Sequence, residues 1–356
     1  MRSREPPARE SKRQKTDNVN IIAAAAGLCL DMQVPTAWAF MQDVVHDGLA
    51  VVPLKNRGLG VVAKRSFVKG ERILAEAPIL RWVVKQSDIG SGGAVSTATL
   101  ESLVDSLDDD ARAAYFALSQ SAERFGPEKS AAGVWMTNAF PAPHPDEKQR
   151  GEQAAGVFAV ICRINHECNP NAHQQWNHPL GKATLHASRA IEAGSEVTIA
   201  YFGSNGRTRA ERAERGEQAF GFRCICSLCQ LRGEAGRKSD ERQKRIGVLG
   251  QRIEASPTDH GVIQLVETKA QLLSEEGLPD QWALADFHRC MMQRESRGDA
   301  QGAKEWARRA SERALVAGGE DCPSYLMYAE AARRVITPSS SGKSAKKAAK
   351  AARQRG

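Results

Sequence analysis

Four cysteines in two separate places constrain this chain more than any other feature of its sequence. Cys168 lies in the stretch Arg163-Ile-Asn-His-Glu-Cys-Asn-Pro-Asn171, and the other three, Cys224, Cys226 and Cys229, lie close together. Three neighbouring thiolates can wrap a tetrahedral zinc ion at about 2.3 Å per Zn–S bond, but they leave its fourth position open. Cys168 fits that vacancy, so we expect one zinc site. The alternative is a set of unpaired core thiols, because free cysteine is among the most buried residue types.

The cysteine usage also bears on the compartment. The chain has 356 residues and eight cysteines, and we find no signal peptide, which indicates a reducing compartment and not a disulfide scaffold. The most apolar run, residues 21–30, is about half the length that a membrane span needs. We therefore expect no membrane segment and interpret this run as a short helix packed on the body.

The basic charge is concentrated at the two ends of the chain. Residues 1–20 carry six Lys/Arg and three Asp/Glu, and residues 336–356 carry six and none, so the net charge of +8 leaves the body between them at −1. Both tails bury little apolar surface, and we expect them to be disordered. They could contact nucleic acid, act as nuclear-import signals through Lys12-Arg-Gln-Lys15 and residues 343–350, or remain merely solvated.

Between the tails, the hydrophobic pattern changes several times. Apolar residues recur at three- and four-residue steps from Leu100 to Leu118, which predicts a helical insertion with one apolar stripe, and Asp108-Asp-Asp110 lies on or between its helices. After Cys229 the sequence pattern again predicts helices, with charged faces and short breaks between them. Short β-type runs punctuated by glycine and turn residues predict strands at residues 51–54, 61–63, 72–75, 157–161, 183–187 and 196–201.

Four segments together resemble one family, the SET-domain protein methyltransferases, in motif, order and spacing. The stretch around Cys168 resembles the family's Asn-His-Ser-Cys-x-Pro-Asn motif, and Glu196-Val-Thr-Ile-Ala-Tyr201 resembles its Glu-x-x-x-x-Tyr motif. Phe220-Gly-Phe-Arg-Cys-x-Cys-x-x-Cys229 resembles the post-SET segment. Arg57-Gly-Leu-Gly-Val-Val-Ala63, with residues 70–78, resembles the opening Gly-x-Gly strands.

The resemblance covers roughly residues 46–230. The long middle insertion with Thr137-Asn-Ala-Phe140 points to the SET-and-MYND-like branch. Residues 81–156 contain no cysteine, so no MYND finger is visible.

The fold implied by the resemblance is α+β: a SET-type fold of small β-sheets with a helical insertion, a zinc-bound post-SET segment and a helical C-terminal domain. That domain resembles antiparallel or tetratricopeptide-like hairpins, although no clean period of about 34 residues recurs, and we expect it to wall one side of a substrate cleft. The expected boundaries are a disordered basic tail at 1–20, an N-terminal helix and first part of the SET domain at 21–80, the insertion at 81–156, the second part at 157–203, the zinc segment at 204–230, the C-terminal helices at 231–335 and a second tail at 336–356.

The activity implied by the resemblance is methyl transfer from S-adenosylmethionine to a lysine side chain of a protein substrate, either a histone tail or a non-histone protein. An in-line displacement needs neither a metal nor a covalent intermediate, so the enzyme mainly aligns a neutral amine with the methyl group. Zinc would then be structural, because four thiolates leave no open position. A nuclear location, a cytoplasmic location or both would suit such substrates, and the pattern fixes no oligomeric state.

The resemblance also assigns residues to roles. Tyr201 would be catalytic, its phenol orienting the amine through weak contacts around the methyl group; the alternative is a buried strand-end tyrosine. Phe220 and Tyr201 would line the lysine channel, and Phe222 would stack on the cofactor. The residues that would hold the cofactor are Arg57, Gly58, Leu59, Gly60, Asn138, Asn165, His166 and Phe222. An ordinary hairpin turn remains the alternative for the two glycines, and a buried asparagine that satisfies a turn remains the alternative for each asparagine.

Two residues depart from the family's pattern. Phe220 stands where relatives near this branch often carry tyrosine, which leaves more room around the amine and makes higher methylation states easier to accommodate. Glu167 stands where serine is usual and puts an acidic side chain beside the zinc strand. The remaining histidines that we considered, His173, His178 and His186, are irregularly spaced, and we interpret them as surface or core residues and not as metal ligands.

Two other functions stay open at this point. One is a catalytically silent SET module that binds a histone tail or another partner, which the intact Tyr201 and Asn165-His166 pair argue against. The other is a nucleic-acid-associated scaffold driven by the basic tails. The near-neutral body makes the scaffold less favourable, because phosphate binding depends on clustered Lys and Arg on a folded face.

Overall fold

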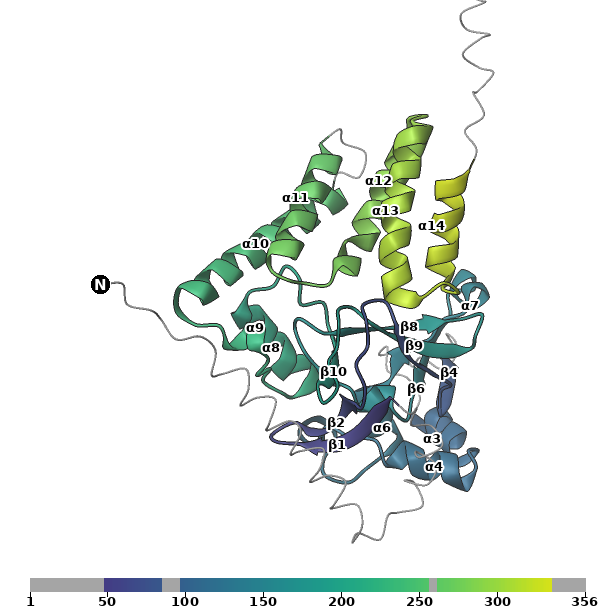
Figure 1. Cartoon of the computed structure of the whole chain (residues 1–356). Coiled ribbons are helices and arrows are strands. Elements are labelled where there is room, and N and C mark those ends of the chain that lie inside the picture. The colour runs from purple at the N-terminus through teal and green to yellow at the C-terminus, as the bar shows by residue number, and fades with distance from the viewer. Residues whose placement is uncertain (1–47, 85–96, 256–260, 335–356) are drawn as a thin grey trace, which may run out of the picture.

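The computed structural model describes residues 48–84, 97–255 and 261–334 (Figure 1). Three sequence predictions therefore lie outside the described residues: the basic tails at 1–20 and 336–356, and the short helix over residues 21–30. Of the helices that the structure describes, none combines the length and the apolar character that a membrane crossing requires.

Short strands in the described part of the chain form three small sheets. Their orders are β1-β2-β10-β7, β3-β9-β8 and β4-β6-β5. The strand bounds are β1 Leu49–Leu54, β2 Gly58–Ala63, β3 Arg72–Glu76, β4 Leu80–Val84, β5 Phe140–Pro141, β6 Gln153–Val157, β7 Asn165–His166, β8 Ala172–Asn177, β9 Lys182–Ala187 and β10 Glu196–Ile199.

The pairing of β10 with β7 is parallel, and it places Thr198 opposite Asn165 and Ile199 opposite His166. The side chain of Asn171 fixes this pairing from outside the two strands. Its carboxamide oxygen accepts the N–H of Thr198 at 2.8 Å, and its amide donates to the backbone oxygen of Glu196 at 2.8 Å. The segment before Cys168 is thereby aligned with the segment that ends at Tyr201.

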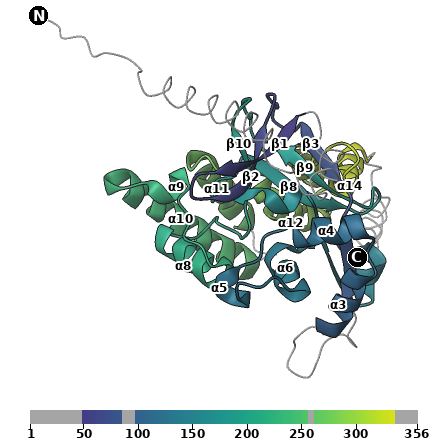
Figure 2. The ribbon, with the colours of Figure 1, turned by 90° about the horizontal axis from the view of Figure 1, so that it is seen from below.

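Helices account for most of the remaining described residues. Figure 1 shows α10 to α14 gathered at one end of the molecule above the sheets, and Figure 2 shows α3 to α6 clustered on another side. The bounds are α3 Thr97–Asp105, α4 Asp109–Phe116, α5 Ala122–Phe125, α6 Ala131–Asn138, α7 Pro145–Gln149, α8 Arg209–Phe220, α9 Ser227–Gln230, α10 Gly233–Ala255, α11 Val262–Glu275, α12 Leu284–Ser296, α13 Ala300–Gly318 and α14 Pro323–Arg333, with 3₁₀ helices η2 Ile161–Arg163 and η3 Asp280–Ala283.

The helical insertion predicted from the apolar stripe at residues 100–118 forms two helices in the structure, α3 and α4. The chain breaks between α3 and α4, where the carboxylate of Asp108 accepts the N–H of Ala111 at 2.8 Å and caps α4. Both helices bury their part of the stripe in one cluster with Trp82 and Trp135. The predicted helical insertion also contains β strands, since β4, β5 and β6 form a sheet within and at the edges of residues 81–156.

The strand predicted at residues 157–161 is wrong in its position. β6 ends at Val157, and the apolar residues after it enter η2. The cause is distant in sequence: the buried carboxylate of Glu76 accepts the N–H groups of Val160 and Ile161 at 2.8 and 2.9 Å. These bonds replace the ladder that a continuing strand would need.

The C-terminal helices pack against the second sheet. Helix α13 lies against β8 and β9 (Figure 1). The contact is polar as well as apolar: Arg72 on β3 pairs with Asp321, and Lys69 pairs with Asp280 at 2.5 Å. The thiols of the cysteine motif belong to the same buried cluster as these helices, with Cys168, Cys226 and Cys229 among its members. The zinc segment therefore lies where the sheets and the C-terminal helices meet.

Candidate active site

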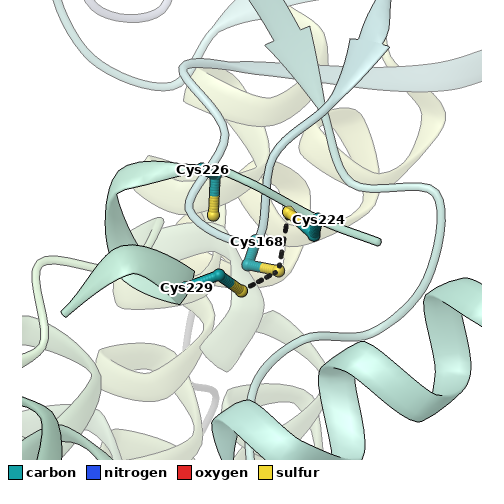
Figure 3. Close-up of side chains that lie close together, drawn as sticks. All are labelled: Cys168, Cys224, Cys226 and Cys229. Atoms are coloured by element: carbon teal, nitrogen blue, oxygen red, sulfur yellow. Dashed lines mark hydrogen bonds between the residues drawn. The ribbon is translucent and has the colours of Figure 1, made fainter. Parts of the chain in front are cut away.

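Figure 3 shows the four predicted cysteine ligands converging on one point. Their Sγ atoms all lie within 4.8 Å of one another. The Sγ of Cys168 lies 3.8 Å from that of Cys224 and 3.5 Å from that of Cys229. A tetrahedral zinc ion with bonds of about 2.3 Å would hold its sulfurs about 3.8 Å apart. The cluster thus has the chemistry and the dimensions of a tetrathiolate metal site.

Different elements supply these sulfurs. Cys168 comes two residues after β7. Glu167, which lies between them, donates its N–H to the backbone oxygen of Ile199 at 2.9 Å. Cys226 is the N-cap of the short helix α9, and Cys229 lies within that helix. The cluster therefore joins the Asn-His strand to the segment that follows α8.

Two N–H donors face the sulfurs. The Nε of Arg212 donates to Cys229 at 3.5 Å, and the Nε2 of His166 lies 3.3 Å from the Sγ of Cys168. Because the Nδ1 of His166 accepts the backbone N–H of Tyr201 at 3.0 Å, the neutral ring carries its proton on Nε2. Burial lowers the pKa of His166 to about 4, so the ring is neutral near pH 7.

Tyr201 lies two residues beyond the end of β10. Its hydroxyl donates to the backbone oxygen of Ile164 at 2.7 Å. Burial raises the pKa of this phenol, so the group stays protonated at neutral pH. A phenol whose proton is already engaged still offers its oxygen lone pairs to another donor.

Aromatic rings surround Tyr201. Phe220 and Phe222 lie with their ring centroids 5.5 and 6.1 Å from that of Tyr201. Phe202 stacks on His166 at 4.5 Å and on Phe220 at 5.7 Å. The result is a wall of apolar surface around one hydroxyl group.

Two cavities are lined in part by these rings. The first, which we call the Asn138 cavity, has a volume of about 340 Å³ and is lined by Arg57, Asn138 and both Phe220 and Phe222. The second, the Cys224 cavity, has about 470 Å³ and reaches from Arg57 to the cysteine segment. Asn165, Tyr201 and Phe222 line both cavities.

A third cavity, the Trp282 cavity, has a volume of about 370 Å³. Its walls come from β8, from the residues that follow β10 and from Trp282 in η3. None of its lining residues is Asp, Glu, Lys or Arg. Tyr201 is the single residue that lines all three of these cavities, and it therefore stands between the Trp282 cavity and the other two.

Arg57 is held by residues of β7 and β10 and by Glu167, which follows β7. Its guanidinium donates to the oxygen of His166 at 2.9 Å and lies 3.3 Å from Glu196 and 3.9 Å from Glu167. Glu167, the residue that departs from the family's pattern, is thus largely buried and paired, and burial raises its pKa. Arg57 also lines the Asn138 and Cys224 cavities.

The two glycines of the Gly-x-Gly motif have different reasons to be glycine. Gly58 has a φ of +67°, which disfavours any residue with a side chain, and a Cβ there would meet open space. Gly60 lies inside β2, where a Cβ would come within 2.8 Å of the Asn165 amide and 2.3 Å of Leu54. Gly60 thus allows Asn165 to lie against β2, and Gly58 and Leu59 line the Asn138 cavity.

Both predicted asparagines use their amide groups within the protein. Asn138 donates to the backbone oxygens of Ser119 and Val134, each at 2.7 Å. Asn165 donates to the backbone oxygen of Leu59 at 3.1 Å and to Glu196 at 2.9 Å. The carboxamide oxygens are the remaining acceptors that these cavity-lining residues have to offer.

The other histidines lie away from the cysteine cluster. His186 accepts from Arg72 at 3.2 Å, His178 contacts His144 ring to ring, and His173 lines the Trp282 cavity. Sequence reasoning missed Arg212 and Trp282, because an arginine in a charged helix and a tryptophan in a short turn carry no local signal of a site.

The comparisons with known proteins agree with this geometry. Residues 58–202 match the model of the SET domain. The chain is 29% identical over 283 residues to the histone-lysine N-methyltransferase set5 of Schizosaccharomyces pombe, a span of 78% of this chain and 81% of that protein. It is 38% identical over 82 residues to the histone-lysine N-methyltransferase ATXR4 of Arabidopsis thaliana, and 35% identical over 78 residues to the protein-lysine N-methyltransferase SMYD4 of Homo sapiens. Those two matches span 25% and 10% of the relatives' own lengths.

Residues 58–202 of this chain thus match a SET domain. The predicted α+β fold of small sheets with a helical C-terminal region is confirmed. The SET-and-MYND-like branch that the insertion indicated agrees with the similarity to a SMYD protein.

Proposed function

We propose that this protein is a protein-lysine N-methyltransferase that uses S-adenosylmethionine. The observation that carries the proposal is the position of Tyr201, the one residue that lines all three of these cavities. Methyl transfer from a bound donor to a protein side chain requires two binding sites that meet at one point. A protein-lysine methyltransferase activity is also what the names of the relatives state for those proteins.

The cofactor would occupy the Asn138 and Cys224 cavities. Their volumes fall in the usual range for sites that bury a small molecule, about 300–1,000 Å³. Gly58 leaves open space beside the backbone, and the carboxamide oxygens of Asn138 and Asn165 offer acceptors. When bound, the cofactor supplies an activated methyl group on a sulfonium.

The chain's own residues would prepare the lysine amine. Phe220, Phe222 and Phe202 exclude water around Tyr201, and a lysine in such surroundings loses its proton more easily because its charged form is desolvated. The Tyr201 hydroxyl, which donates its hydrogen bond to the backbone oxygen of Ile164, would accept a hydrogen bond from the incoming amine and so orient the lone pair of the amine. Such alignment is the main contribution that an in-line transfer needs.

We propose that the four thiolates hold a structural zinc ion. The fit rests on the donor set and on the spacing of the sulfurs, together with two N–H groups that face them. A four-thiolate shell is closed to substrate. Metal binding would add folding free energy to the segment that carries Phe222.

The Trp282 cavity would receive the substrate segment around the target lysine. Histone lysine methylation is named for the relative in Schizosaccharomyces pombe, and we propose histones as the first substrates to test, with non-histone proteins as the alternative. A histone substrate would require at least part of the protein to be nuclear. A silent SET module remains the rival function, and the intact contacts of Tyr201 argue against it.

The test incubates purified protein with labelled S-adenosylmethionine and an extract that contains histones. Wild type, Tyr201→Phe and the matched control Tyr325→Phe from α14 are compared, with cofactor affinity measured in parallel by calorimetry. Label on discrete bands, lost about a hundredfold in Tyr201→Phe and kept in the control, supports the proposal. Tight cofactor binding without any label on histones or other proteins favours the silent module, and no cofactor binding contradicts the methyltransferase function.

A further inference from the structure

Arg212 is the largest fully buried side chain of the described residues, with 1% of its surface exposed. It lies in α8, which begins after the N-cap Thr208 and ends at Phe220. Its Nη1 donates to the backbone oxygen of Arg207 at 2.7 Å, and its Nε donates to the sulfur of Cys229 at 3.5 Å. A guanidinium is thus packed directly against the cysteine cluster.

A buried guanidinium needs a counter-charge. An arginine stays charged at any ordinary pH, and removing an unpaired charge from water costs several kcal/mol. In the part of the chain that the structure describes, no carboxylate forms an ion pair with Arg212. The groups that act on its charge most strongly are the thiols of Cys229, Cys168 and Cys226.

A zinc ion bound by four thiolates supplies that counter-charge. Four negative sulfurs around a divalent cation leave a formal charge of about −2 in a buried place. A neutral set of thiols would leave the guanidinium uncompensated, and the tetrathiolate without Arg212 would lose the guanidinium that donates to one of its sulfurs. Each group therefore offsets the burial cost of the other.

We propose that Arg212 is the charge partner of the zinc tetrathiolate and that it fixes helix α8 to the metal site. This inference rests on the zinc site of the proposed function. Arg212 acts through Cys229 and does not touch the substrate cavity, so it is a positioning residue.

The position of α8 matters because the aromatic wall begins at its end. Phe220 is the last residue of the helix, and the N–H of Phe222 donates to the oxygen of Gly216 in the same helix at 3.2 Å. The rings of Phe220 and Phe222 lie 6.2 Å apart. Arg212 therefore connects the metal cluster, at the start of α8, with the cavity-lining rings at its end.

The experiment compares wild type with Arg212→Gln, Arg212→Lys and the control Arg215→Gln, an exposed arginine on the same helix. Zinc content is measured by elemental analysis, and zinc loss is followed as its transfer to a chelator. Outer contacts of metal ligands typically change metal affinity by about 10–100-fold. We expect Arg212→Gln to lose zinc about tenfold faster or more, Arg212→Lys to stay within about threefold of wild type, and Arg215→Gln to be unchanged.

A spectroscopic measurement separates this role from a general loss of packing. With cobalt(II) in place of zinc, the sulfur-to-cobalt charge-transfer band should move to longer wavelength in Arg212→Gln, because a thiolate without its cationic donor gives up electrons more readily. Arg215→Gln should leave the band in place, and Arg212→Lys should move it less than Arg212→Gln.

The outcomes keep the two proposals apart. Wild-type protein without zinc overturns the zinc site and this inference with it. Zinc-loaded wild type, with Arg212→Gln losing zinc at the same rate and showing the same cobalt band, overturns this inference alone. If Arg212→Gln does not fold, Arg212→Lys decides: zinc loss more than about tenfold faster than wild type contradicts a role of the charge.

Discussion

The Nδ1 atom of His166 accepts the backbone N–H of Tyr201 at 3.0 Å, while the other nitrogen of the same ring faces the sulfur of Cys168 at 3.3 Å. One imidazole thus links the cysteine cluster to the residue between the cavities. Through this link the proposed zinc site, although closed to substrate, would still matter for the proposed activity. Its effect would be to hold the backbone at Tyr201 in register with β7.

Loss of one cysteine ligand should therefore affect both metal and cofactor. We expect Cys226→Ser to reduce bound zinc to well below one ion per chain. We also expect it to weaken the binding of S-adenosylmethionine at least about tenfold, because Cys226 itself lines the Cys224 cavity. Elemental analysis and calorimetry measure the two effects. Cys290→Ser, at a buried cysteine of α12 outside the cluster, serves as the control and should retain both. Unchanged zinc content in Cys226→Ser would contradict the four-ligand site.

Trp282 should affect the protein substrate and not the cofactor. It is contributed by the C-terminal helices to the Trp282 cavity, and it lines neither of the other two cavities. We expect Trp282→Ala to raise KM for the protein substrate about tenfold, as the loss of an aromatic contact of roughly 1–1.5 kcal/mol implies, with cofactor affinity within about twofold of wild type. Steady-state kinetics with the substrate found by labelling provide the measurement. Leu326→Ala, an exposed position on α14, is the control. A change in cofactor affinity with an unchanged KM for the protein substrate would contradict the assignment of the Trp282 cavity to the substrate.

The cysteine cluster could be predicted from sequence because metal ligation restricts both residue type and spacing, and three nearby thiols demand a fourth. The approach of Cys168 to the other cysteines follows from that chemistry without any knowledge of the chain between them. The placement of Tyr201 required the resemblance to a family, since a tyrosine after a short strand has no local signature of catalysis.

Other features depend on partners far along the chain. The apolar run after Val157 looks like a strand, but a carboxylate that lies 84 residues earlier, on Glu76, takes its N–H groups. β8 was missed because its sequence, Ala-His-Gln-Gln-Trp-Asn, shows no alternation of apolar and polar residues. Arg212 could not be singled out either, because its role is set by a sulfur on another segment.

The product distribution should respond to Phe220. Its ring lies 5.5 Å from that of Tyr201 and lines the Asn138 cavity, which the cofactor would occupy. A hydroxyl on this ring would take up space beside the methyl donor, at the point where the amine would reach it past Tyr201. We expect Phe220→Tyr to shift products toward lower methylation states, with total turnover reduced less than about tenfold. Mass spectrometry of the modified lysine measures the ratio. Phe125→Tyr, on the short helix α5 outside the three cavities, controls for the added hydroxyl, and an unchanged product ratio in Phe220→Tyr would place the ring outside the amine's path.

The stability of the protein should depend on pH through two kinds of buried group, histidines and a carboxyl group, whose effects are opposite. Burial lowers the pKa of His173 and of His186 to about 4, below the usual value of 6.5. The unfolded chain therefore binds more protons in this window, and stability is lost as pH falls from about 6.5 to about 4. Burial raises the pKa of Glu76 to about 7 from 4.5. Its contribution is present below about 4.5 and is lost as pH rises through about 7.

Two histidines outweigh one carboxyl, so the melting temperature of the wild type should fall as pH is lowered from 6.5 to 4.5. His186 faces Arg72, Asp321 and His173. Arg72 stays positive and Asp321 stays negative between pH 6.5 and 4.5. In the double variant His173→Gln/His186→Gln this fall should become much smaller, because Glu76 then opposes His166, whose pKa burial also lowers to about 4. Thermal melts at closely spaced pH values measure both slopes. A double variant that loses stability on acidification as steeply as the wild type would assign the effect to other groups, and the single variant His144→Gln, at a half-exposed histidine, should keep the wild-type slope.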